Sequence, residues 1–138
     1  MDRRSSGSVA EGKVVTELIE CGAVVSQPLY YEARYDVLAD FDGDIFRVQI
    51  KRAFDSGKEN SAKVEARGRN SCGDNPYDET EIDCICVYVP HLDECHWYWI
   101  NEISNQFNIY IGDWEELSPA NKAQMRNPNE YKITERFK

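Results

Sequence analysis

The sequence predicts one α/β or α+β domain, in which an N-terminal helix, a series of strands and later helices enclose a single core. The chain has 138 residues, of which 41% are hydrophobic and 12% aromatic, and this is enough apolar material for one core. The apolar residues follow a helical period near the N-terminus and then the alternation of strands. No internal repeat or low-complexity linker divides the chain, so we expect a single unit over residues 1–138.

The N-terminal helix is expected over residues 8–21, because Ser8 is a suitable N-cap and Gly22 suits the position after a helix end. Its expected apolar stripe consists of Val14, Val15, Leu18 and Ile19. Glu11 falls within this stripe when the residues are spaced at about 100°. A carboxylate on a buried face needs a partner, unless water and the donors of the first helical turn solvate it.

Strands are expected to follow the helix, over residues 23–29, 35–41, 45–53, 61–68, 82–90 and 96–100. Turn-forming residues predict a loop over 72–76. Near the C-terminus we expect a further helix over 119–125 and an irregular end from Asn127.

The strands over 35–41 and 45–53 are expected to form a hairpin, because Asp42-Gly43 is a strong turn signal. With these residues at the turn, Leu38 faces Arg47 and Asp36 faces Gln49. One face of the hairpin is then apolar and belongs to the core, with Val37, Ala39, Phe41, Phe46, Val48 and Ile50. The other face carries Asp36, Leu38, Asp40, Ile45, Arg47, Gln49 and Lys51.

The polar face combines residues suited to hydrolysis. Asp36, Gln49 and Lys51 lie on one sheet surface, and the carboxylate of Glu11 is placed to reach over its rim. Mg²⁺ prefers hard oxygen ligands and keeps several waters, so one or two carboxylates and a substrate phosphate oxygen suffice to bind it. Such an ion neutralises developing charge and lowers the pKa of a bound water, while Lys51 could stabilise the transition state.

Charge is unevenly distributed along the chain. The net charge is −9, which argues against a protein coated in basic charge for non-specific nucleic-acid binding. Residues 47–69, however, hold seven bases and three acids, and no Lys or Arg occurs from Asn70 to Asn121. This basic segment is suited to hold a polyanion at one place, although an ordinary solvated strand pair has the same composition.

The cysteines and the apolar segments indicate the cellular compartment that we expect for the protein. The chain contains five cysteines, an odd number, and nothing indicates secretion, so we expect reduced and mostly buried thiols in a cytoplasmic protein. A zinc-binding module built on Cys84, Cys86 and Cys95 is the alternative, although C-x-C is an uncommon zinc spacing. No apolar segment has the roughly 20 residues of a membrane span.

Several of these residues together resemble the PD-(D/E)XK nuclease superfamily, in particular the group whose last motif is Q-x-K. The resemblance rests on Glu11, Tyr35-Asp36, Asp42-Gly43 and 48–51, and it covers about residues 7–103, with 104–138 as a C-terminal extension. Group I intron homing endonucleases and small archaeal and bacterial nucleases typify this group. The resemblance implies a restriction-endonuclease-like core, which is a mixed β-sheet with a central hairpin flanked by helices.

The resemblance also implies roles for the site residues. Asp36 would be the metal-binding acid, Glu11 the helix acid that helps to hold metal or water, and Lys51 the catalytic lysine. Gln49 would occupy the usual position of an acid, and this replacement removes one negative charge from the metal site. The implied catalytic set is Glu11, Asp36, Gln49 and Lys51, with the first three as ligands of Mg²⁺ or Mn²⁺. Tyr35 stands where the superfamily has proline.

The expected function is therefore Mg²⁺-dependent DNA endonuclease activity. A structure-specific nuclease resembling the Holliday-junction resolvases, or a non-catalytic DNA-binding protein on the same fold, is the alternative. The partner would be double-stranded or branched DNA and not a membrane, and the residues expected to contact it are Arg47, Arg52, Lys58, Lys63, Arg67 and Arg69. Because one such site cuts one strand, we expect a homodimer or homotetramer.

Overall fold

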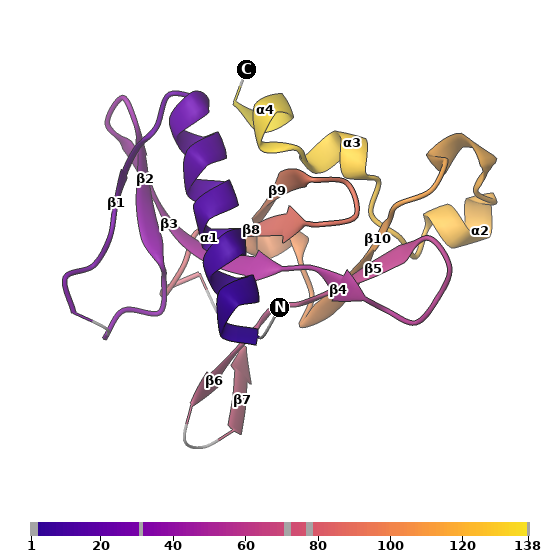
Figure 1. Cartoon of the computed structure of the whole chain (residues 1–138), viewed down its shortest axis with the longest axis horizontal. Coiled ribbons are helices and arrows are strands. Elements are labelled where there is room, and N and C mark those ends of the chain that lie inside the picture. The colour runs from indigo at the N-terminus through magenta and orange to yellow at the C-terminus, as the bar shows by residue number, and fades with distance from the viewer. Residues whose placement is uncertain (1–2, 31, 71–72, 77–78, 138) are drawn as a thin grey trace.

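The computed structural model describes residues 3–30, 32–70, 73–76 and 79–137. Its centre is a five-stranded sheet with helix α1 (Arg3–Glu20) across one face (Figure 1). The strands are β1 (Val24–Ser26), β2 (Val37–Phe41), β3 (Asp44–Arg52), β8 (Cys84–Val89) and β9 (Glu94–Trp99), in that spatial order. Strands β3 and β8 are parallel and the other neighbours are antiparallel, so the sheet is mixed as expected.

The expected hairpin is confirmed as β2 and β3. Its pairs run from Val37 with Val48 to Phe41 with Asp44, and Leu38 faces Arg47. The turn residues have positive φ, 54° at Asp42 and 97° at Gly43, as a tight two-residue turn requires. Of the six residues expected on the apolar face, Val37, Ala39, Val48 and Ile50 are buried in the core under α1, and Phe41 and Phe46 are partly buried and pack against it.

The expected pairing of Asp36 with Gln49 is wrong, because β2 begins only at Val37. The backbone N–H of Asp36 donates instead to the carbonyl of Val48, at 2.8 Å. Asp36 therefore lies where the chain enters the sheet, one residue before the paired strand.

Helix α1 begins at Arg3, before the expected start, and ends at Glu20. Gly22 has a φ of 99°, and its N–H donates to the carbonyl of Ile19, so the expected glycine terminator is confirmed. The buried residues of the helix are Ala10, Val14 and Leu18. Ile19 is 55% exposed and not in the stripe as expected, because Ala10 centres the stripe on Val14, about 140° away from Ile19.

A second, smaller sheet covers the opposite face of β8 and β9. It consists of β4 (Phe54–Asp55), β5 (Ser61–Glu65) and β10 (Gln106–Tyr110), in the order β10-β5-β4. Its Val64, Phe107 and Ile109 form one core cluster with Ile85 and Val87 of β8. The half of the large sheet that contains β1 and β2 is not part of this second core.

The strand expected over 61–68 is interrupted at Ala66, whose N–H donates to the carbonyl of Asn105. The chain continues as β6 (Arg67–Asn70), which pairs with β7 (Gly73–Pro76) in a hairpin that projects from the body (Figure 1). The loop expected over 72–76 is therefore wrong for residues 73–76, because their backbone pairs with β6. Cys72 lies outside the described residues.

The C-terminal part is ordered into short helices. They are η1 (Ile100–Glu102), η2 (Trp114–Glu116), α2 (Pro119–Lys122), α3 (Pro128–Tyr131) and α4 (Ile133–Arg136). The expectation of an irregular end from Asn127 is wrong, because this segment packs against both faces of the large sheet. Tyr131 stacks on Tyr98 on one face, with ring centroids 4.5 Å apart, and Phe137 stacks on Phe41 on the other, at 4.2 Å.

Candidate active site

Asp36 is attached to the strand that carries Gln49 and Lys51. Its Oδ2 accepts a hydrogen bond from the backbone N–H of Ile50, at 2.8 Å. The side chain of Ile50 is buried under α1, so its two neighbours on β3 point to the opposite face of the sheet. The acid is thus held beside the backbone from which Gln49 and Lys51 project.

Glu11 reaches the same place from α1. Its Oε1 accepts a hydrogen bond from Nε2 of Gln27, at 3.0 Å, just after the end of β1. Glu11 and Asp36 line one cavity of about 740 Å³, together with Gln27, Pro28, Leu29, Tyr30, Ala33 and Tyr35. The helix acid and the strand acid are therefore brought together. Sequence reasoning missed Gln27, because no motif marks an amide that holds another side chain.

The other two candidate site residues, Gln49 and Lys51, lie on β3. Gln49 and Lys51 are half-buried and lie beside Ile85 and Val87 of the parallel strand β8. Neither is among the described residues that line the cavity of Glu11 and Asp36. The positive charge of Lys51 nevertheless acts on Asp36, since it lowers the pKa of that carboxyl.

The electrostatics of Asp36 favour a bound cation. Burial raises the pKa of Asp36 above its usual value, and the charge of Glu11 raises it further. The hydrogen bond from Ile50 and the charge of Lys51 lower this pKa, but the net direction is upward. A cation between the two carboxylates would stabilise the ionised form of Asp36, because it would compensate the negative charge that burial and Glu11 disfavour.

The donor set fits Mg²⁺ better than a softer metal. The second oxygens of Asp36 and Glu11 and the amide oxygen of Gln49 are hard ligands, and Mg²⁺ completes its shell with waters. Among the described residues, no group of three or more His, Cys, Asp and Glu side chains could hold a metal ion. Metal binding at this site would therefore depend on the two acids, the amide, waters and substrate oxygens.

The alternative zinc module is not supported. Cys84, Cys86 and Cys95 are buried in the core under α1, as expected for reduced thiols. Burial raises the pKa of the Cys95 thiol far above its usual value, which disfavours the thiolate that zinc requires. The ring of His96 contacts Glu94 and Tyr98, and it is the neighbour of Cys95 on β9, where successive side chains alternate between faces.

Arg47 is held by Asp83 at the start of the parallel pair. Its Nε and Nη2 donate to the two oxygens of Asp83 at 3.1 and 2.9 Å, and its backbone N–H donates to the same carboxylate at 2.7 Å. The guanidinium also donates to the carbonyls of Thr80 and Glu79. These contacts tie β3 to the residue that precedes β8, so Arg47 has a structural role.

The other bases of the expected DNA contact set are spread over the surface. Arg52 and Lys58 are exposed, at the end of β3 and in the loop before β5, and Lys63 is half-buried on β5. Arg67 and Arg69 belong to the projecting hairpin, and their side chains lie outside the described residues.

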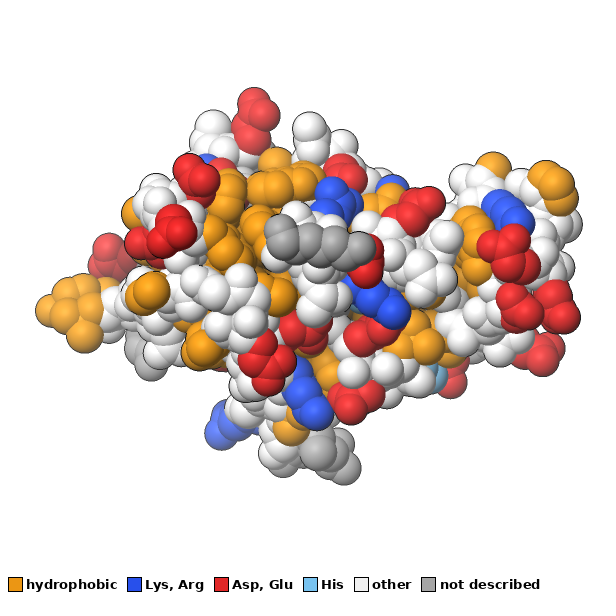
Figure 2. Space-filling model, turned by 90° about the horizontal axis from the view of Figure 1, so that it is seen from above, with side chains coloured by type: hydrophobic (Ala, Val, Ile, Leu, Met, Phe, Trp, Pro, Cys, Tyr) orange, Lys and Arg blue, Asp and Glu red, His pale blue; other side chains and the backbone are white. Residues whose placement is uncertain are grey.

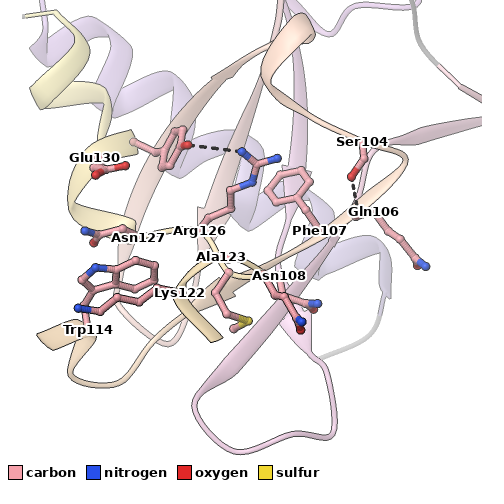
Figure 3. Close-up of a pocket in the computed structure, with 13 residues that line it drawn as sticks. Ser104, Gln106, Phe107, Asn108, Trp114, Lys122, Ala123, Arg126, Asn127 and Glu130 are labelled. Carbon is pink, nitrogen blue, oxygen red and sulfur yellow. Dashed lines mark hydrogen bonds between the residues drawn. The ribbon is translucent and has the colours of Figure 1, made fainter. Parts of the chain in front are cut away.

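A second cavity, of about 430 Å³, lies beside β10 and the C-terminal helices (Figure 3). Figure 3 shows Arg126 next to Phe107; the Arg126 guanidinium lies 5.4 Å from the centre of that ring and 6.0 Å from that of Tyr131. Of the described residues that line this cavity, Glu130 is the only carboxylate. Without a pair of acids, this cavity lacks the means to hold a hydrolytic metal ion.

Comparison with known proteins identifies the family of the chain and its fold. A family model described as PD-(D/E)XK endonuclease matches residues 1–132. A search of the curated proteins finds no match. Among solved structures, a bacterial homing endonuclease, I-Ssp6803I, is similar with a TM-score of 0.73 and 20% identity, over 90% of this chain and 88% of that chain. This likeness confirms the expected restriction-endonuclease-like fold.

A further solved structure is that of Hjc, a Holliday junction resolvase from Archaeoglobus fulgidus. It is 15% identical, with a TM-score of 0.46, over 88% of this chain and 98% of that chain. At this score the likeness carries no argument about function.

No described helix is long and apolar enough to cross a membrane.

Proposed function

The chain belongs to the PD-(D/E)XK endonuclease family, and we propose that it is a Mg²⁺-dependent endonuclease that hydrolyses phosphodiester bonds of DNA. One observation carries this proposal. Glu11 and Asp36 line a single cavity, and Asp36 is hydrogen-bonded to the backbone between Gln49 and Lys51. The acid pair therefore lies where a helix meets the sheet, and one of the two acids is tied to the strand that carries the amide and the lysine.

Each acid has a defined part in this proposal. Asp36 and Glu11, with the amide oxygen of Gln49, would hold Mg²⁺, for which Mn²⁺ could substitute. The ion supplies charge neutralisation at the phosphate and a water of lowered pKa. The Ile50 N–H fixes the orientation of Asp36, and Gln27 fixes that of Glu11, so both carboxylates are positioned before substrate arrives.

Lys51 and Gln49 adjust the charge of the site. The Lys51 ammonium would stabilise the negative charge that develops on the phosphate oxygens during attack. Gln49 is neutral, so the site holds two acids where a third would be usual for the family that the sequence resembles. We therefore expect weaker metal binding than in a three-acid site.

DNA would approach through the basic residues. We propose Arg52, Lys58, Lys63, Arg67 and Arg69 as phosphate contacts, and Arg47 as the least available of the expected set because Asp83 engages it. A double-strand cut requires two sites related by a two-fold axis, so we propose that the working form is a homodimer or homotetramer.

The test is nicking of supercoiled plasmid by the purified chain. We expect nicked or linear product with MgCl₂ and none with EDTA. DNA retention in a gel without nicking under any Mg²⁺ or Mn²⁺ condition would favour the non-catalytic binding protein. Competition between a four-way junction and linear duplex then distinguishes a structure-specific nuclease, for which the junction should compete far better.

A further inference from the structure

Two large apolar side chains stand exposed at the mouth of the candidate active site. Leu29 is 84% exposed and Tyr30 is 74% exposed, the highest fractions among the large hydrophobic residues that the structure describes. Both line the cavity of Glu11 and Asp36. Figure 2 shows hydrophobic side chains on the surface at the end of the molecule that β1 and β2 form. Exposed apolar residues beside a polar site indicate contact with a ligand that has an apolar part.

The chain on both sides of this pair is anchored. Before it, Gln27 is hydrogen-bonded to Glu11, and Pro28 restricts the backbone. After it, Arg34 forms an ion pair with Glu81, at 3.0 Å, and Asp36 is bonded to Ile50. The exposed pair therefore lies between two anchored points, Gln27, which is bonded to Glu11, and Asp36, which is bonded to Ile50.

We propose that Leu29, supported by Tyr30, is a wedge that inserts between stacked bases of DNA next to the phosphate held at Glu11 and Asp36. This inference rests on the proposed nuclease function. Aliphatic side chains inserted between base steps unstack them and bend the duplex, which brings more of its surface against the protein. Neither Leu29 nor Tyr30 can bind a phosphate as a cation does, but both can contact the apolar faces of bases.

The position of the pair favours DNA over a second copy of the chain as the partner. Leu29 and Tyr30 line the cavity that would receive the scissile phosphate, so any substrate bound there must pass next to them. A second copy seated on the same side chains would close the cavity against substrate. Insertion is easiest where base pairing is already lost, and so the wedge predicts a preference for DNA with a disrupted step.

The experiment measures binding without cleavage, in the Asp36→Asn background. Two probes are used: a mixed-sequence duplex, and the same duplex with a central mismatch beside a 2-aminopurine base. We expect the mismatched probe to bind about tenfold more tightly and its fluorescence to rise as the base unstacks. Leu29→Ser and Tyr30→Ser should lose both effects, and Leu29→Met should keep them. Val24→Thr is the matched control, because Val24 is 70% exposed on β1 and outside the cavity.

Several outcomes would overturn the wedge. Equal binding of the two probes by the Asp36→Asn protein would do so, as would an unchanged preference and fluorescence rise in Leu29→Ser. A lower mass for Leu29→Ser in light scattering without DNA would show that Leu29 joins two copies instead. Plasmid nicking by the chain with Asp36 intact is read separately. If the Asp36→Asn protein shows neither probe effect while the chain with Asp36 intact nicks plasmid, the wedge alone is refuted. If the Asp36→Asn protein shows both probe effects while the chain with Asp36 intact does not nick plasmid, the nuclease alone is refuted.

Discussion

The carboxylate of Asp36 accepts a hydrogen bond from the backbone N–H of Ile50, with 2.8 Å between Oδ2 and N. Ile50 is buried in the core under α1, and it separates Gln49 from Lys51 on β3. The position of the acid is therefore set by a core strand rather than by the loop that carries it. This bond ties Asp36 to the strand that carries two of the other candidate catalytic residues, Gln49 and Lys51.

The raised pKa of Asp36 predicts a pH dependence of activity and of stability. Burial and Glu11 raise this pKa, so metal binding and cleavage should fail at a higher pH than for an ordinary Asp, which titrates at about 3.9. A folded-state pKa above the unfolded value means that the stabilising contribution is present at low pH and is lost as pH rises through the folded pKa. At pH 7 without metal, Asp36→Asn should melt at the same or a higher temperature, which calorimetry measures. A large fall in the melting temperature would contradict this.

Lys51→Ala should reduce the single-turnover rate of cleavage by about 10²-fold or more, because it removes one electrostatic stabiliser of the transition state. DNA affinity should change little, by about one phosphate contact. Rapid-quench kinetics and fluorescence anisotropy measure the two quantities. Lys122→Ala is the control, since Lys122 lines the other cavity. An equal loss of affinity and rate would indicate that Lys51 only binds DNA.

Gln49→Glu should retain activity and reach half of its maximal rate at a lower Mg²⁺ concentration. The substitution places a charged oxygen on the strand to which Asp36 is hydrogen-bonded and would add one negative charge to the proposed metal site. The measurement is the initial rate of plasmid nicking across a MgCl₂ titration. An unchanged Mg²⁺ requirement would remove Gln49 from the ligand set.

Asp83→Asn should destabilise the fold without removing a catalytic group. Asp83 accepts three hydrogen bonds from Arg47, and these lower the pKa of its carboxyl. We expect a loss of about 2 kcal/mol in the free energy of unfolding, the range for hydrogen bonds to a charged group. Because the folded-state pKa is lowered, this contribution is present above the unfolded pKa and is lost as pH falls. Urea unfolding of the parental chain and of Asp83→Asn at pH 7 and pH 3 measures this loss and its pH dependence. The same difference in the free energy of unfolding at both pH values would contradict the prediction.

The hairpin and the end of α1 could be predicted because local sequence determines them. Asp42-Gly43 selects a two-residue turn, and this turn sets the register and the buried face of β2 and β3. Gly22 ends α1 for a similar local reason. The sequence places Glu11 towards the rim of the sheet, and the cavity that Glu11 shares with Asp36 agrees with this, although the pairing expected between Asp36 and Gln49 is wrong.

The remaining features depend on contacts between distant segments. Phe137 is ordered by stacking on Phe41, 96 positions earlier, and no local pattern near Asn127 indicates this partner. Strand β10 is paired with β5, more than forty residues before it, and the short alternation of β10 alone does not predict a strand. The bonds of Arg47 to Asp83 join residues 36 positions apart, and the charge of Arg47 alone does not indicate this partner. Tertiary packing decides these cases.

The most direct test of the account is a comparison of two double variants that lose the same charges. Glu11→Gln with Asp36→Asn neutralises the candidate site, and Glu20→Gln with Asp44→Asn neutralises one exposed acid of α1 and one of β3. We predict that in MgCl₂ the first protein leaves supercoiled plasmid intact, while the second nicks it at the parental rate and both show the parental circular dichroism spectrum. Nicking at the parental rate by the Glu11→Gln and Asp36→Asn protein would show that the active site lies elsewhere.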